Sequence, residues 1–177
     1  FMLVLNVGGV VDPSPVMDVR NILLLSQLGV ETGGALADIL LGKANPSGKL
    51  TTTWAAFEEY PEMPDFEDMN ETRYREGIYV GYRYFDTFRK PALFPFGHGL
   101  SYSRFVYKYM TVRPVTASAE TGGTMDAPRY ELAVTVKNDS LRAGKEVVQV
   151  YVAPKERQDD RPAHKLLSLI HISEPTR

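Results

Sequence analysis

The chain has 177 residues, a length that suits one domain or two small ones. Its content of 44% hydrophobic and 24% charged residues is ordinary for a soluble globular chain. The net charge of -2 implies no basic patch for nucleic acid, and no apolar run approaches the roughly 20 residues that a bilayer span requires.

Cysteine is absent, which excludes disulfides, cysteine nucleophiles and thiolate metal sites. The first residues, FMLVLNVGG, have no basic region and no cleavage site, so they are not a signal peptide. They are typical of a strand entered partway, and we therefore expect the natural N-terminus to lie upstream. These features fit both a cytoplasmic and a secreted bacterial protein.

The first part of the chain alternates between strand and turn signals. Residues 2–7 form a continuous apolar run closed by two glycines, which predicts a buried parallel strand. Residues 12–15, DPSP, predict a turn that opens a short helical stretch. Residues 22–25 are a second candidate for a buried strand.

A helix is predicted over residues 32–41, with Thr32 as its cap and an apolar stripe on one side. Gly42 stands where a left-handed residue commonly ends a helix, and residues 45–48 predict a tight turn. The succession of strand, crossover, strand and helix indicates a layered α/β domain.

Residues 60–72 lack a clear period and overlap a stretch rich in acidic residues that runs from Glu58 to Glu71. This composition predicts an exposed acidic loop. Residues 75–85 alternate in a way that predicts a strand, with Tyr82 and Tyr84 on one face. Residues 94–100 form a glycine-rich aromatic turn.

A second region begins near Phe105. Residues 116–127 predict a loop between strands, and the alternation in residues 130–137 predicts a half-buried antiparallel strand. Residues 146–152 predict another strand. This order is typical of the first strands of a β-sandwich.

Two phosphate-binding motifs fail on inspection. Residues 29–34 have the glycine spacing of a P-loop, but Ala35 replaces the required lysine and Glu31 would repel phosphates. Residues 5–9 lack the third glycine and the helix start of a dinucleotide fingerprint. We interpret Gly33 and Gly34 as allowing a helix to approach a strand closely.

Other catalytic patterns have little support. His98, His164 and His171 are far apart in the sequence, so no short-spaced pair of metal ligands exists. His98 is interpreted as a turn or packing residue. The candidate serine nucleophiles, Ser47, Ser101 and Ser103, do not lie in a G-x-S-x-G elbow.

An ordered set of phrases is more specific. They are ETGGALADILLG at 31–42, NPSGKL at 45–50, RYREGIYVGYRYFD at 73–86, FPFGHGLSY at 94–102, and VTVKN at 134–138 with KEVVQVYV at 145–152. The first four resemble the C-terminal α/β sandwich domain of family 3 glycoside hydrolases, the family of many β-glucosidases. The last pair resembles the fibronectin type III-like domain that follows it.

The resemblance implies three segments. Residues 1–104 are the partial α/β sandwich domain, residues 105–167 are the N-terminal part of the fibronectin type III-like domain, and residues 168–177, SLIHISEPTR, resemble a translated sequencing adapter. We expect this tail to be foreign and to have no structural role.

The resemblance also implies a function for the parent protein, which is retaining hydrolysis of β-glucosides by two carboxyls about 5 Å apart. In the family the nucleophilic aspartate lies in a separate barrel and the acid/base glutamate lies before residues 2–7. We therefore expect no catalytic residue, cofactor or metal in this chain. We expect a small carbohydrate as the partner, no nucleic acid and no membrane. The alternative is a non-catalytic carbohydrate-binding or scaffolding module.

Several residues could nevertheless contact a sugar. Glu76 is flanked by Arg73, Tyr74, Arg75 and Tyr79, and we interpret it as a strand-end carboxylate paired with arginine rather than as a catalytic acid. Aromatic rings could stack on sugars, but in such strands they more often pack in a core. This second set is Trp54, Tyr60, Tyr79, Tyr82 and Phe96.

Overall fold

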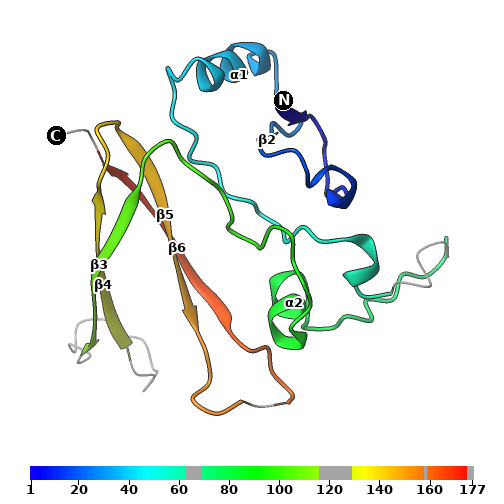
Figure 1. Ribbon diagram of the computed structural model, residues 1–177. Helices are drawn as coiled ribbons and strands as arrows, with labels where there is room; N and C mark the ends of the chain where they lie inside the picture. Colours follow the sequence, from blue (N-terminus) through cyan, green and yellow to red (C-terminus); the bar gives the residue numbers. More distant parts are fainter. Residues whose placement is uncertain (63–68, 116–128, 158, 175–177) are drawn as a thin grey trace.

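The structure is a computed structural model that describes residues 1–62, 69–115, 129–157 and 159–174. Within these ranges the strands form three sheets of two strands each, and two α-helices lie in the first half of the chain (Figure 1). The predicted loop at 116–127 and the middle of the predicted acidic loop lie outside the described residues.

The first sheet is the parallel pair of β1 (Leu3–Leu5) and β2 (Ile22–Leu24), which confirms both predicted strands. The predicted burial is wrong for this chain, since Val4 is exposed and the other residues of the two strands are only half-buried. A 3₁₀ helix at Ser14–Val16 lies between them, as the DPSP sequence predicts. Asp12 Oδ1 accepts the amide of Ser14 at 2.8 Å, and hydrogen bonding to Ser14 lowers the pKa of the Asp12 carboxyl.

Helix α1 (Thr32–Leu40) confirms the predicted helix, and Gly42 has the predicted positive φ of 70°. Thr32 does not cap it, because Glu31 holds the N-cap position and the Thr32 hydroxyl donates to the carbonyl of Gly29. The interpretation of Gly33 and Gly34 is wrong. A Cβ at Gly33 would meet nothing within 4 Å, and one at Gly34 would meet only the Glu31 carboxylate.

The strand predicted at residues 75–85 is also wrong. Residues 74–80 form successive turns, and α2 (Tyr82–Phe88) follows them. Gly81, with φ of 58°, is the N-cap of the helix, and Arg89 ends the helix in the left-handed region. The aromatic residues Tyr82, Phe85 and Phe88 recur every three positions, so the helical period decides the structure.

The core of the first half lies where the segment around Trp54 meets α2. Trp54 is 5% exposed, and its amide donates to the Phe94 carbonyl at 2.8 Å. Buried Phe85 of α2 packs edge-on against Tyr60 with ring centroids 5.1 Å apart. These contacts join α2 to the aromatic turn at 94–100.

The second sheet is the antiparallel pair of β3 (Phe105–Val115) and β4 (Arg129–Asn138). β4 confirms the predicted alternation, because Leu132, Val134 and Val136 are half-buried while their neighbours are exposed. A bulge at Lys108 lets Tyr107 pair with Val136 and Met110 with Val134.

The third sheet pairs β5 (Gly144–Val152) with β6 (Lys165–Glu174). β5 confirms the predicted second strand, and its Val147 and Val148 are buried. The expectation that the tail has no structural role is wrong, because residues 168–174 pair with β5 from Val150 to Gly144. Leu169, Ile170 and Ile172 give this added strand β-branched and other apolar side chains.

Candidate functional site

The strongest candidate site is the turn segment, which we define as residues 69–81. The Gly77 amide donates to the Tyr74 carbonyl, and the Tyr79 amide donates to the Glu76 carbonyl at 3.0 Å. The segment projects away from α2 (Figure 1). It carries Glu76 and Tyr79, the acid and one of the five aromatic residues that sequence reasoning singled out.

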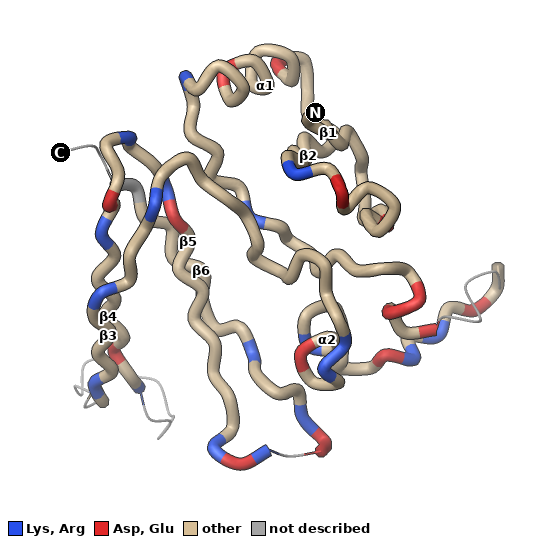
Figure 2. Tube along the Cα trace, viewed as in Figure 1, with Lys and Arg blue, Asp and Glu red and all other residues tan. Residues whose placement is uncertain are grey.

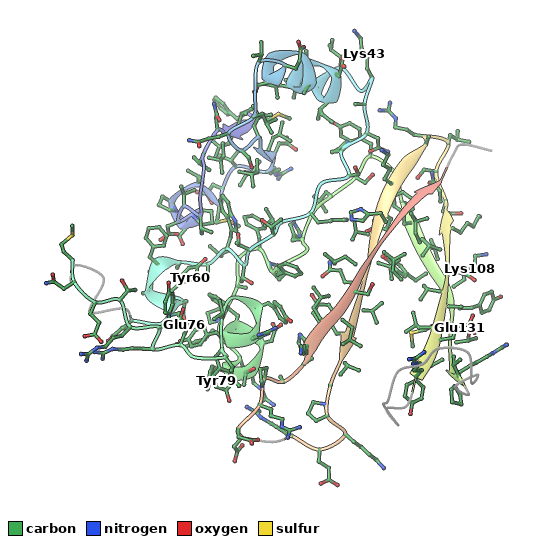
Figure 3. The ribbon with its side chains drawn as sticks, turned by 180° about the vertical axis from the view of Figure 1, so that it is seen from behind. Lys43, Tyr60, Glu76, Tyr79, Lys108 and Glu131 are labelled. Atoms are coloured by element: carbon green, nitrogen blue, oxygen red, sulfur yellow. The ribbon has the colours of Figure 1, made fainter. Side chains whose placement is uncertain are left out.

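Glu76 lies in a turn rather than at a strand end. Of the two arginines expected beside it, Arg73 pairs with Glu71 at 2.9 Å. Within the described residues, Glu76 Oε2 is buried and accepts no hydrogen bond. Figure 3 shows Glu76 between Tyr60 and Tyr79, close to α2. Its surroundings are therefore those of a packed turn residue.

The five candidate aromatic residues lie in two packed clusters. Trp54 and half-buried Tyr60 belong to the core, where the Tyr60 hydroxyl donates to the Thr53 carbonyl at 2.7 Å. Burial raises the pKa of the Tyr60 phenol. Tyr82 and Phe96 lie 5.4 Å apart, and Tyr79 packs on Phe88 at 5.0 Å. These contacts agree with the core interpretation.

The three histidines are in separate places. His98 lies in the aromatic turn, where its carbonyl accepts the Leu50 amide and its ring packs against Phe94. Burial, with a contribution from Lys49, lowers the pKa of His98. His164 Nε2 lies 2.8 Å from Asp86 Oδ2, and His171 is on β6. Over the described ranges, no group of three His, Asp or Glu side chains could hold a metal ion.

The candidate serines bind an amide instead of a histidine. The Ser101 hydroxyl donates to Asn45 Oδ1 at 2.9 Å, and Asn45 Nδ2 donates to Ser103 Oγ at 2.8 Å. Ser103 is buried and donates to the Arg142 carbonyl. Ser47 lies in the strand-free stretch before Gly48, beside the turn at Gly99. This arrangement is a structural junction.

Neither phosphate motif forms an anion site. At residues 29–34 the Glu31 carboxylate lies near the start of α1, the position that a phosphate would need. Lys and Arg residues are interspersed with Asp and Glu along the chain (Figure 2). In the parts that are described, no helix is both long and apolar enough to cross a membrane.

Comparison with known proteins decides the family. The model of the glycosyl hydrolase family 3 C-terminal domain matches residues 1–102, more than half of the chain. The chain belongs to glycosyl hydrolase family 3.

Relatives in this family are named as β-glucosidases. β-Glucosidase A of Butyrivibrio fibrisolvens is 42% identical over 93% of this chain, and thermostable β-glucosidase B of Acetivibrio thermocellus is 39% identical over 93%. The crystal structure of the family 3 β-glucosidase of Bifidobacterium adolescentis matches 99% of this chain, with a TM-score of 0.85 and 35% identity.

The chain spans only part of these relatives, namely 21% of the two enzymes compared by sequence and 25% of the Bifidobacterium chain. The family match and the structural similarity show that the chain has the fold of the family 3 C-terminal domain, a mixture of strands with few helices.

Sequence reasoning missed the contact between Asp86 and His164, because 78 residues separate them and neither lies in a recognised catalytic motif.

Proposed function

We propose that this chain is a supporting part of a retaining glycosidase that hydrolyses the O-glycosyl bonds of β-glucosides. The observation that carries this proposal is the 42% identity to β-glucosidase A over 93% of the chain. Both reacting carboxyls belong to other parts of the parent protein, and its partner is a small carbohydrate. The chain by itself is inactive.

We assign residues 1–104 to a partial α/β sandwich domain and residues 105–167 to the start of a fibronectin type III-like domain. The parallel pair of β1 and β2 with α1 supports the first assignment. The two antiparallel ribbons support the second. The turn segment lends a wall to the outer part of the substrate cleft, since its exposed side chains project from the packed core.

The test is to express the full-length parent and assay it with a panel of nitrophenyl glycosides. We expect the β-glucoside to be hydrolysed fastest, with retention of the anomeric configuration. If the parent hydrolyses none of the glycosides, the proposed enzymatic function is refuted. The alternative, a carbohydrate-binding or scaffolding module, would then be favoured. Turnover by residues 1–177 alone would overturn the supporting role.

The natural sequence is further proposed to depart from this one after residue 167. The adapter-like sequence at 168–177 supports this, whereas the pairing of residues 168–174 with β5 shows only that this segment fits there as a strand. Resequencing the parent gene through this region tests the proposal. Recovery of SLIHISEPTR in the genomic sequence would refute it.

A further inference from the structure

Helix α2 and the loop between β5 and β6 are joined by a set of polar contacts. His164 Nε2 lies 2.8 Å from Asp86 Oδ2, and the Ala163 amide donates to Thr87 Oγ1 at 2.9 Å. The Leu166 amide donates to the Tyr82 hydroxyl at 2.8 Å. Thr87 is buried, so the helix is held on its inner side.

Aromatic rings surround the same contact. The His164 imidazole stacks on Tyr82 with an interplanar angle of 17° and meets Tyr151 of β5 edge-on at 4.9 Å. Tyr82 also packs against Tyr151 at 5.7 Å. Because rings in such arrangements interact favourably beyond their buried area, the cluster fixes the rotation of α2 as well as its position.

The turn segment runs directly into α2 and shares this attachment. The Tyr79 hydroxyl donates to the Asp159 carbonyl in the β5–β6 loop at 3.2 Å, and Figure 3 shows Tyr79 where that loop meets α2. Other side chains of the segment are exposed. Tyr74 is 76% exposed, and Ile78 and Val80 are about half exposed.

The position of α2 depends on these contacts because a helix of seven residues is not stable by itself. Segments with few buried contacts open locally at a low cost in free energy. The turn segment exposes Tyr74, Ile78 and Val80 and continues directly into α2, and so its position follows that of α2.

We propose that Asp86 and His164 are positioning residues, which hold α2 on the β5–β6 loop and thereby fix where the turn segment projects into the outer substrate cleft. This inference rests on the function proposed above. The outer cleft receives the leaving group of a β-glucoside, and the exposed Tyr74 ring offers it an apolar surface. Loss of the pair affects binding of that group more than bond cleavage.

The experiment compares Asp86→Ala, His164→Ala and the double variant in the full-length parent. Hydrogen exchange is measured over residues 69–81, and KM and kcat are measured with nitrophenyl β-glucoside and with a β-linked glucose disaccharide. We expect faster exchange and a KM raised about five- to tenfold, with kcat nearly unchanged, as for lost uniform binding. The double variant is expected to match the single variants.

Two further variants give matched controls. Asp86→Asn keeps an oxygen that can accept from His164, so it is expected to restore both exchange and KM. Asp139→Ala removes an exposed ion pair with Lys137, whose 2.7 Å length is similar to that of the Asp86–His164 contact. This variant is expected to change neither the exchange rate of residues 69–81 nor KM. Should an alanine variant fail to fold, His164→Gln, which retains a donor without the ring, is expected to show an intermediate exchange rate.

Unchanged exchange and KM in a folded Asp86→Ala or His164→Ala variant would overturn the proposal. A fall in kcat with KM unchanged would also overturn it, because positioning of the outer cleft predicts the reverse. A parent that hydrolyses no glycoside would refute the proposed function instead, and the exchange data would still report whether the pair holds the turn segment.

Discussion

Asn45 shows how one side chain joins distant parts of the chain. Its Oδ1 accepts from the Ser101 hydroxyl and the Tyr102 amide, and its Nδ2 donates to Ser103 Oγ and the Ala143 carbonyl. A side-chain amide offers two donors and two acceptor sites, and here all four are used. The asparagine that begins the NPSGKL phrase thus joins this segment to residues 101–103 and to Ala143.

Replacing Asn45 with alanine leaves buried partners such as Ser103 without their bonds. We expect Asn45→Ala to lower the free energy of unfolding by about 2–3 kcal/mol. Denaturant unfolding of the parent protein and faster exchange of the Tyr102 amide check this. Lys43→Ala is the control, because it removes only an exposed ion pair in which Lys43 Nζ lies 3.9 Å from Asp38 Oδ1. It is expected to lower the free energy of unfolding by at most about 0.5 kcal/mol. Equal effects of the two would contradict the prediction.

His98 has a pKa below its ordinary 6.5, because of burial and of Lys49. The folded protein therefore binds a proton less readily at this imidazole than the unfolded chain does. Stability from this group is complete above about pH 7 and is lost as the pH falls through about 6.5.

We expect His98→Gln to reduce the loss of stability between about pH 7 and pH 5. Urea midpoints of the parent protein at several pH values measure this dependence. Gly29→Ala, at a position where a Cβ meets nothing within 4 Å, serves as the comparison and is expected to keep the original pH dependence. An unaltered pH dependence in His98→Gln would exclude the effect.

At the scale of elements, the turn at 94–100 needs glycine for close packing. A Cβ at Gly99 would overlap the carbonyl oxygen of Gly48, and the Lys49 ammonium donates to the Gly99 carbonyl at 2.7 Å. Lys49 also pairs with Glu146 of β5 at 3.1 Å, with both side chains largely buried. The turn therefore holds the 45–50 segment against β5.

Gly99→Ala is expected to destabilise the protein by about 1–3 kcal/mol, because the clash is with backbone. Gly29→Ala is the matched control, since a Cβ there meets nothing within 4 Å. Thermal unfolding of the two variants in the parent separates the cases. If Gly99→Ala unfolds at the same temperature as Gly29→Ala, the close approach is not required.

Sequence patterns predicted most elements and failed where two periods compete. The apolar runs of β1 and β2 and the alternation of β4 and β5 have one consistent interpretation. Residues 75–85 alternate like a strand, while Tyr82, Phe85 and Phe88 lie at helical spacing. Only the packing of Phe85 in the core favours the helix, and no local signal reports that contact.

At the scale of the whole molecule, the three sheets have two strands each and their outer edges are unpaired within the described residues. The β3–β4 ribbon leaves Tyr107, Met110 and Val112 more than half exposed. Two-stranded sheets are marginally stable in water, and exposed apolar edges favour association. The unpaired edges and exposed apolar side chains of this chain therefore favour association.

We expect residues 1–177 in isolation to be poorly soluble or only partly ordered. Calorimetry would show a broad, weak thermal transition, and light scattering would show association. The full-length parent is the control and is expected to unfold cooperatively. A sharp transition from a monomeric isolated chain would contradict this expectation.

The partners of Asp86 and Asn45 could not be predicted from sequence. Each contact joins residues more than 50 positions apart, and hydropathy patterns describe only which face of an element is buried. The absence of a phosphate-binding lysine, by contrast, could be recognised from Ala35 alone.

The extra residue Lys108 sets the phase of the β3–β4 ribbon. Because it has no partner on β4, Tyr107 and Met110 both fall on the side of Val136 and Val134, and the apolar stripe continues unbroken along the strand. If Lys108 instead took a partner on β4 in a regular ladder, every later residue of β3 would shift by one, Met110 and Val112 would move to the opposite side, and Thr111 and Arg113 would turn inward. Deleting Lys108 would keep the flanking pairs in register, so the apolar stripe depends on the bulge and not on which amino acid occupies it.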